Sequence, residues 1–179
     1  MKKQTAVRPP IIIRAATAAD VKTLVRFSAA MALETEGRRL DQNRLRKGIE
    51  GVLNAPARGF YKVAELTTRT SRAVVGQLLV TFEWSDWRNA TFWWIQSVYV
   101  DPVWRRKGVY RTMHEIILEE ARQGGDICGV RLYVEGDNAI AKAVYKKVGL
   151  SASSYHVFES DFMLRKAGRT PRARNTSGT

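Results

Sequence analysis

Residues 98 to 111 read Val-Tyr-Val-Asp-Pro-Val-Trp-Arg-Arg-Lys-Gly-Val-Tyr-Arg and contain the strongest structural signal in the chain. The order of residue types predicts an apolar strand, a break at Asp101-Pro102, a basic turn with one glycine, and the start of an amphipathic helix. The first N–H groups of a helix have no partner within it, and the helix dipole favours an anion there. A phosphate-bearing ligand is therefore the first hypothesis for this turn. A solvated basic turn in front of an ordinary helix is the alternative.

The rest of the chain predicts strands and helices in the order β α α β β β α β α β. We expect strands at 11–14, 60–66, 73–84, 92–100, 130–134 and 155–164. We expect helices that start near Val21, Asp41, Gly108 and Asn138, the last with Ile140 and Val144 facing inward. Short links make the first strands antiparallel, whereas the last strand–helix–strand crossover makes a parallel pair. The prediction is one mixed α/β domain over residues 10–164.

The charge of the chain is concentrated at its ends. It has 179 residues, 30 basic and 17 acidic, for a net charge of +13. Eight basic residues lie in 1–9 and 165–179, which we expect to be a flexible N-terminal tail and a disordered C-terminal tail. The domain between them is much closer to neutral, so we do not expect nucleic acid as a partner.

Other classes of protein are excluded by what the sequence lacks. No apolar run approaches the roughly 20 residues of a membrane span, and no signal peptide precedes Pro10, so we expect no membrane partner. The single cysteine, Cys128, cannot form an internal disulfide, which favours a reducing cytoplasm. Two histidines and one cysteine do not favour a metal site.

Two motifs together carry a family resemblance. Arg105-x-x-Gly108-x-Tyr110 follows the predicted strand that ends at Val100, and Asn138-x-x-Ala141-x-x-x-Tyr145-x-x-x-Gly149-Leu150 opens the last helix. On the predicted frame of elements this combination resembles the GNAT superfamily of acetyl-CoA-dependent N-acetyltransferases. The resemblance covers about residues 10–164. The family usually has Gly or Ala at the position of Tyr110, and a tyrosine there can narrow the turn or stack on the cofactor.

The resemblance implies a GNAT-like acyl-CoA N-acyltransferase fold, in which antiparallel N-terminal strands join a parallel pair that splays around acetyl-CoA. The turn would hold the pyrophosphate through its N–H groups, and Gly108 would allow the backbone to approach it closely. The strand from Val98 would pair with the pantetheine arm, and a backbone N–H near Val98 would polarise the thioester carbonyl. The implied cofactor-binding residues are Val98, Tyr99, Val100, Arg105, Arg106, Lys107, Gly108, Val109, Tyr110, Arg111, Asn138, Ala141 and Tyr145.

The same resemblance assigns chemistry to two side chains. Tyr145 would protonate the leaving thiolate. The sequence pattern around Tyr145 alone fits a tyrosine of the core, and the position of Asn138 alone fits a helix cap. Glu83, at the end of an apolar strand, is the candidate general base, and a surface carboxylate is its alternative. Gln96 could only orient a water molecule.

The acceptor side is predicted from acidic and aromatic residues. Glu34 and Glu36 are expected in a loop between the first two helices, where this superfamily walls its acceptor site. Asp86 and an aromatic mouth would suit a cationic amine. The aromatic residues expected there are Trp84, Trp87, Trp93 and Trp94.

The resemblance implies an acetyltransferase that works by direct attack in a ternary complex, and these residues favour a primary amine of a small cationic metabolite as its acceptor. The substrate-binding residues would be Glu34, Glu36, Glu83 and Gln96. A protein or peptide amine, or another acyl-CoA, is the first alternative. A basic nucleic-acid-binding module is the alternative from another class, and a homodimer is left open.

Overall fold

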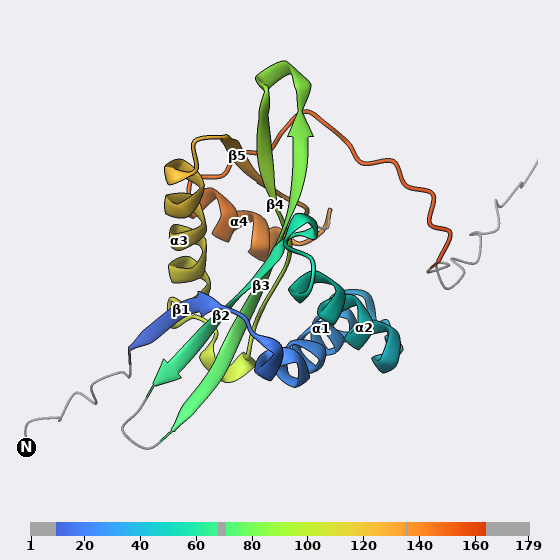
Figure 1. The fold of residues 1–179 in the computed structure, drawn as a ribbon, viewed down its shortest axis with the longest axis vertical. Coiled ribbons are helices and arrows are strands. Elements are labelled where there is room, and N and C mark those ends of the chain that lie inside the picture. Colours follow the sequence, from blue (N-terminus) through green and yellow to red (C-terminus); the bar gives the residue numbers. More distant parts are fainter. Residues whose placement is uncertain (1–9, 68–70, 135, 164–179) are drawn as a thin grey trace, which may run out of the picture.

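The computed structural model describes residues 10–67, 71–134 and 136–163, which build a twisted five-stranded sheet with helices on both faces (Figure 1). The strands are β1 (Ile11–Ala15), β2 (Phe60–Thr67), β3 (Arg72–Ser85), β4 (Ala90–Val100) and β5 (Ile127–Leu132), and they lie side by side in that order. Neighbours from β1 to β4 pair antiparallel, whereas β4 and β5 pair parallel. The predicted mixed α/β fold is confirmed. The two predicted tails, residues 1–9 and 165–179, lie outside the described residues.

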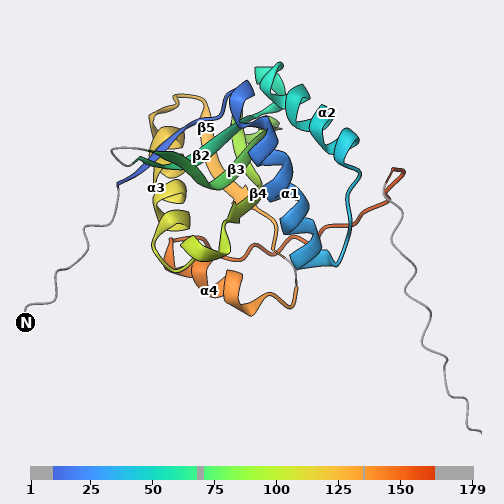
Figure 2. The same cartoon turned by 90° about the horizontal axis from the view of Figure 1, so that it is seen from below.

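The helices divide into two layers. α1 (Val21–Glu36) and α2 (Gln42–Leu53) cover one face of the sheet, and α3 (Val109–Gln123) covers the other, with α4 (Ala139–Lys147) near its N-terminal end (Figure 2). The core under α1 and α2 consists of Val21, Leu24, Val25, Ile49, Tyr61 and Val63. The core under α3 consists of Ala64, Leu66, Val75, Leu78, Val80, Ile95, Val109, Met113 and Ile117. Burial of these alternating apolar side chains is the main force that holds the layers together.

A buried ion cluster ties β1 and β2 to the start of α1. Arg14 Nη1 donates to Asp20 at 2.8 Å, and Arg14 Nη2 donates to Glu65 at 2.7 Å. Both carboxylates are buried. Asp20 also accepts from the backbone N–H and the hydroxyl of Thr17, which together form a capping box. The cluster fixes the point where the chain leaves the sheet and enters the helical layer.

One extra residue interrupts β4. Leu79 of β3 pairs with Ser97 but the next residue, Val80, pairs with Ile95, so Gln96 forms a β-bulge. Pairing with β5 ends at Ile95, and no described residue pairs with the open edge of β4 beyond it. β4 therefore has a bulge at Gln96 and, beyond Ile95, an edge that no described residue of β5 pairs with.

The structure corrects two predictions near the C-terminus. The strand expected at 155–164 is absent from its described part, residues 155–163, which runs away from the sheet as irregular chain (Figure 1). Side-chain turns compete with strand pairing there, because Asp161 accepts from the Met163 N–H at 2.7 Å and Ser153 from the Tyr155 N–H at 3.3 Å. Without a strand beside it, α4 leaves Ile140 83% exposed instead of facing inward.

Among the described residues, no helix has both the length and the apolar character needed to cross a bilayer.

Candidate active site

The basic turn, which we define as residues 105–111, has a backbone suited to an anion. Asp101 caps a short 3-10 turn by accepting from the Val103 N–H at 3.1 Å, and the chain then reverses at Arg106 (φ 61°) and Gly108 (φ 89°) into α3. Among the described residues, the backbone turn and cap hydrogen bonds of this region are donated by the N–H groups of Trp104, Arg105 and Thr112, and none of them by residues 106 to 111. Successive unpaired N–H groups at a helix N-terminus form a concave site for phosphate.

Space and charge in the turn also fit a phosphate-bearing ligand. A Cβ added at Gly108 would meet no atom within 4 Å, so the surface in front of the backbone is open. Arg106, Lys107 and Arg111 are exposed around it. Lys107 lies 4.6 Å from the ring centre of Trp104, and Arg111 pairs with Glu115 at 2.7 Å. Of the four basic residues predicted to supply charge to the pyrophosphate, Arg106, Lys107 and Arg111 are thus exposed around the turn.

Arg105 differs from its neighbours because its side chain turns back toward the protein. Its Nη2 donates to Glu34 Oε2 at 2.6 Å, and its Nε donates to the Val100 carbonyl at 2.9 Å. Tyr99 donates from its hydroxyl to Glu34 Oε1 at 2.8 Å. Burial favours the protonated form of Glu34, but the hydrogen bonds from Arg105 and Tyr99 outweigh it and lower the pKa of this carboxyl. Glu34 is thus an ionised anchor for Arg105.

The position of Glu34 and Glu36 corrects the sequence prediction. Both belong to the last turn of α1 and not to a loop, because the helix continues to Glu36 and ends at Gly37. Glu34 contacts Arg105 of the basic turn. Glu36 instead lines a groove of about 570 Å³ that Glu34 does not line. The groove is lined by Ser28, Met31, Ala32, Glu36, Arg38, Leu40, Leu45, Tyr61, Ser97, Glu159 and Asp161. The structure therefore separates two carboxylates that the sequence grouped together.

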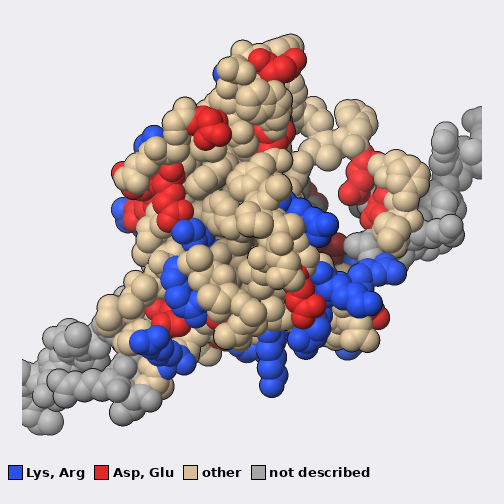
Figure 3. Space-filling model, viewed as in Figure 1, with Lys and Arg blue, Asp and Glu red and all other residues tan. Residues whose placement is uncertain are grey.

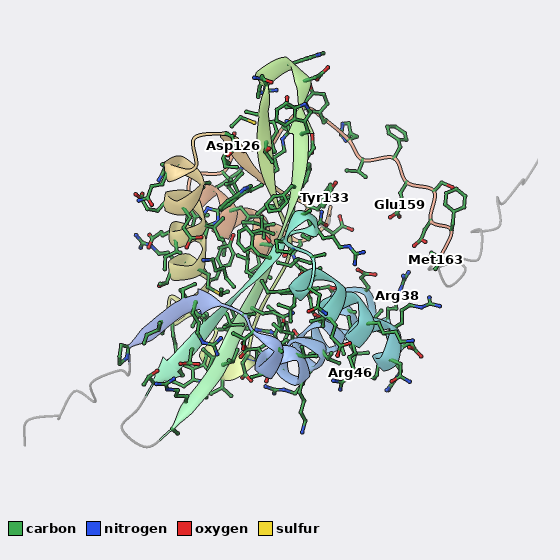
Figure 4. The ribbon with its side chains drawn as sticks, in the orientation of Figure 1. Arg38, Arg46, Asp126, Tyr133, Glu159 and Met163 are labelled. Atoms are coloured by element: carbon green, nitrogen blue, oxygen red, sulfur yellow. The ribbon has the colours of Figure 1, made fainter. Side chains whose placement is uncertain are left out.

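The groove combines acidic residues with a basic rim. Its carboxylates come from the end of α1 and from the C-terminal segment, and Glu36 pairs with Arg38 at 3.7 Å. Arg38 and Glu159, which Figure 4 labels, come from the α1–α2 connection and from that segment. In Figure 3, basic side chains lie over the adjoining helices, so the carboxylates of the groove are close to positive charge. Ser97 places the inner end of the groove beside the bulge of β4.

The open face of the sheet beyond α1 carries Glu83, but this carboxylate is engaged. Its Oε1 accepts from Arg131 at 2.8 Å, and its Oε2 accepts from the indole of Trp94. Arg131 lies 3.5 Å above the ring of Phe92, and Trp94 stacks on Tyr133 at 4.3 Å. Sequence reasoning missed Arg131 and Tyr133, because β5 gave only the pattern of a buried strand.

Nearby on this face, Gln96 donates to the Thr81 hydroxyl at 2.8 Å. The predicted aromatic mouth does not form as a unit. Trp84 and Trp87 lie at the tip of the β3–β4 hairpin, 60% and 86% exposed, and Trp93 packs against Phe60 on the opposite face. Strand alternation separates Trp93 from Trp94, so only Trp94 joins the site.

Tyr145 on α4 belongs to a cluster of rings in which His114 is buried and Tyr110 and Tyr145 are partly buried. Its ring centre lies 5.9 Å from that of Tyr110, and the Tyr110 hydroxyl lies 3.5 Å from Nδ1 of His114. Burial raises the pKa of Tyr145 and of Tyr110. Burial also lowers the pKa of His114, an effect that the backbone of Val148 partly opposes. The sequence pattern placed His114 on the helix but gave no sign of this cluster.

Asn138 begins α4 as predicted, and its Oδ1 accepts from the Ala141 N–H at 2.9 Å. Its side chain therefore serves as a helix cap, and its amide nitrogen remains the group that could reach a ligand.

Comparison with known proteins agrees with this geometry. The model of the acetyltransferase (GNAT) family matches residues 31–150. A structure described as a possible acetyltransferase from Clostridium difficile 630 is 39% identical, covers 86% of this chain and 99% of its own, and has a TM-score of 0.78.

More distant structures share the fold. An acetyltransferase of Trypanosoma brucei is 18% identical over 84% of this chain and 99% of its own, with a TM-score of 0.64. An aminoglycoside N-acetyltransferase in complex with CoA is 12% identical over 87% of this chain and 97% of its own, with a TM-score of 0.65. No curated protein sequence matches the chain.

Proposed function

The chain belongs to the acetyltransferase (GNAT) family, and from this premise we propose that it transfers an acetyl group from acetyl-CoA to the primary amine of a small cationic molecule. The observation that carries the proposal is the basic turn beside the bulged, open edge of β4. A phosphate site and a strand edge next to each other suit a ligand with a pyrophosphate and an amide-bearing arm.

The residues of this chain fit the cofactor. The N–H groups of the basic turn and the side chains of Arg106, Lys107 and Arg111 would hold the pyrophosphate. The open edge of β4 from Val98 to Val100 would pair with the pantetheine arm, and Asn138 would contact it from α4. When bound, acetyl-CoA supplies the acetyl group as a reactive thioester.

The acceptor amine is proposed to enter through the groove. Glu36 and the two carboxylates of the C-terminal segment would attract an ammonium group, although the chain as a whole carries a net charge of +13. Ser97 and Gln96 lie where the groove meets the bulge, so an amine there would be close to the slot between β4 and β5.

Tyr145 and Glu83 are the proposed proton-transfer groups. Because burial raises its pKa, the Tyr145 hydroxyl stays protonated near neutral pH and can donate a proton to a leaving thiolate. Glu83 would receive the proton of the ammonium through water on the open face. Each of its oxygens already accepts one hydrogen bond and keeps a second lone pair that could accept the proton.

A screen for thiol release tests the proposal. The full-length protein is incubated with acetyl-CoA and a panel of amines, and free thiol is measured with a chromogenic disulfide. The panel contains mono-, di- and polyamines, an aminoglycoside, single amino acids and a short peptide, and each is repeated with propionyl-CoA. We expect the highest kcat/KM for a primary amine that carries a second positive charge. Turnover only with the peptide, or only with propionyl-CoA, would replace the proposed substrate class. No turnover together with nucleic-acid binding that weakens steeply with salt would favour the non-enzyme alternative.

A further inference from the structure

We propose that Glu34 is a positioning residue that holds the basic turn in its binding shape through Arg105, and that couples this turn to the wall of the groove. This role rests on the proposed function, because it assumes that coenzyme A occupies the basic turn. It assigns Glu34 to the cofactor and leaves Glu36, two residues later, to the acceptor.

The contacts of Glu34 bridge three elements. Its two oxygens accept from Arg105 at 2.6 Å and from Tyr99 at 2.8 Å, so the end of α1 is joined both to the start of the basic turn and to β4. Arg105 is also bound to the Val100 carbonyl at 2.9 Å and lies 5.2 Å from the ring centre of Tyr99. These contacts tie the Arg105 side chain to β4 and to the end of α1, directly before the reversal at Arg106.

The last turn of α1 has a second side. Met31, Ala32 and Glu36, from the last two turns of α1, line the groove. The turn is closed at Gly37 (φ 64°), whose N–H donates to the Leu33 carbonyl at 3.1 Å. A displacement of the basic turn that moved Arg105 would therefore pull on the same helical turn that forms the groove. Occupancy of the basic turn should order the groove wall.

A purely electrostatic role for Glu34 makes the opposite prediction. The carboxylate removes one positive charge from the surroundings of a phosphate site, so its neutralisation alone would strengthen the binding of an anion. Loss of the positioning contacts would weaken binding, because the turn would lose its preorganised shape. The sign of the change in affinity distinguishes the two roles.

Calorimetric titration with coenzyme A, without any acceptor, measures this sign. We expect Glu34→Gln to bind coenzyme A about fivefold to tenfold more weakly than the unmodified chain, as loss of a charge-assisted contact implies. Tyr99→Phe, which keeps the ion pair, should weaken binding by less. Glu36→Gln is the matched control, because it removes the same charge from the same helical turn without touching Arg105, and its affinity for coenzyme A should stay unchanged.

Hydrogen exchange measures the coupling. Coenzyme A should slow the hydrogen exchange of the amides of residues 31–37 in the unmodified chain and in Glu36→Gln. In Glu34→Gln, most of this protection should be absent. Unchanged or tighter binding by Glu34→Gln, or equal protection in all three proteins, would overturn the role of Glu34 while leaving the proposed function intact. Absence of binding by the unmodified chain would instead overturn the proposed function and this role together.

Discussion

Substitution of Gly108 tests the basic turn directly. Gly108 has φ 89°, a conformation that costs other residues about 1–2 kcal/mol, but a side chain there would meet no atom within 4 Å. Gly108→Glu should therefore destabilise the ligand-free protein by backbone strain alone, which lowers Tm by about 2–8 °C in a chain of this size. The same substitution puts a carboxylate in front of the N–H groups that should hold phosphate.

The larger effect is expected on ligand binding. Coenzyme A at 100 times its Kd should stabilise the unmodified protein by about 2.7 kcal/mol, or about 5–11 °C in Tm, because it binds only the folded state. Gly108→Glu should reduce this shift to less than about 2 °C at the same ligand concentration. The assay is thermal unfolding with and without coenzyme A.

Two controls separate strain from charge. Gly108→Ala carries the same backbone strain without the carboxylate and should keep most of the shift. Gly125→Glu adds the carboxylate beyond the far end of α3, where a Cβ also meets no atom within 4 Å, and should keep all of it. A folded Gly108→Glu protein with an undiminished ligand-induced shift would refute the assignment of the basic turn.

Three further perturbations address catalysis and stability. Tyr145→Phe should lower kcat by about tenfold to 100-fold with little change in the affinity for coenzyme A. If kcat is unchanged and product release does not limit the rate, Tyr145 is only a packing residue. Glu83→Gln should lower kcat/KM about 100-fold and change the basic limb of its pH profile. A lower Tm with an unaltered profile would show that Glu83 only holds Arg131. Arg14→Met leaves the Asp20 carboxylate buried without its partner and should cost about 3 kcal/mol in urea unfolding at pH 7, which an unaltered midpoint would contradict. Because the hydrogen bond from Arg14 lowers the pKa of Asp20 below its ordinary 3.8, this contribution is complete above that pH and is lost as pH falls through the folded-state pKa. The difference between the two proteins should therefore shrink in acid.

The sequence predicted features that depend on neighbouring residues. Asp41 and Asn138 cap their helices as expected, and Gly108 occupies the turn where a positive φ is needed. Such signals are local, because a cap or a turn is specified by a few adjacent residues. The crossover between β4 and β5 also followed from the order of elements.

Side-chain partners from distant elements could not be predicted in this way. Arg105 and Glu34 are 71 positions apart, and Arg131 and Glu83 are 48 positions apart. Periodicity shows which face a residue occupies but not which residue of another element it meets. The predicted strand at 155–164 failed for a related reason, since alternation favours a strand only where a neighbouring edge pairs with it.

The bulge at Gln96 gives β4 two halves whose side chains are out of phase. Before the bulge, Trp93 and Ile95 pack toward α3, and after it Val98 does so, while Tyr99 meets Phe27 of α1. A strand with unbroken alternation would turn Tyr99 toward α3 and away from Glu34. Deletion of Gln96 would remove the bulge but leave Val98 and Tyr99 on their present faces, because Ser97 would then take the alternate position after Ile95. The inserted residue thus lies directly after the last position of β4 that pairs with β5, where the open edge of the strand begins.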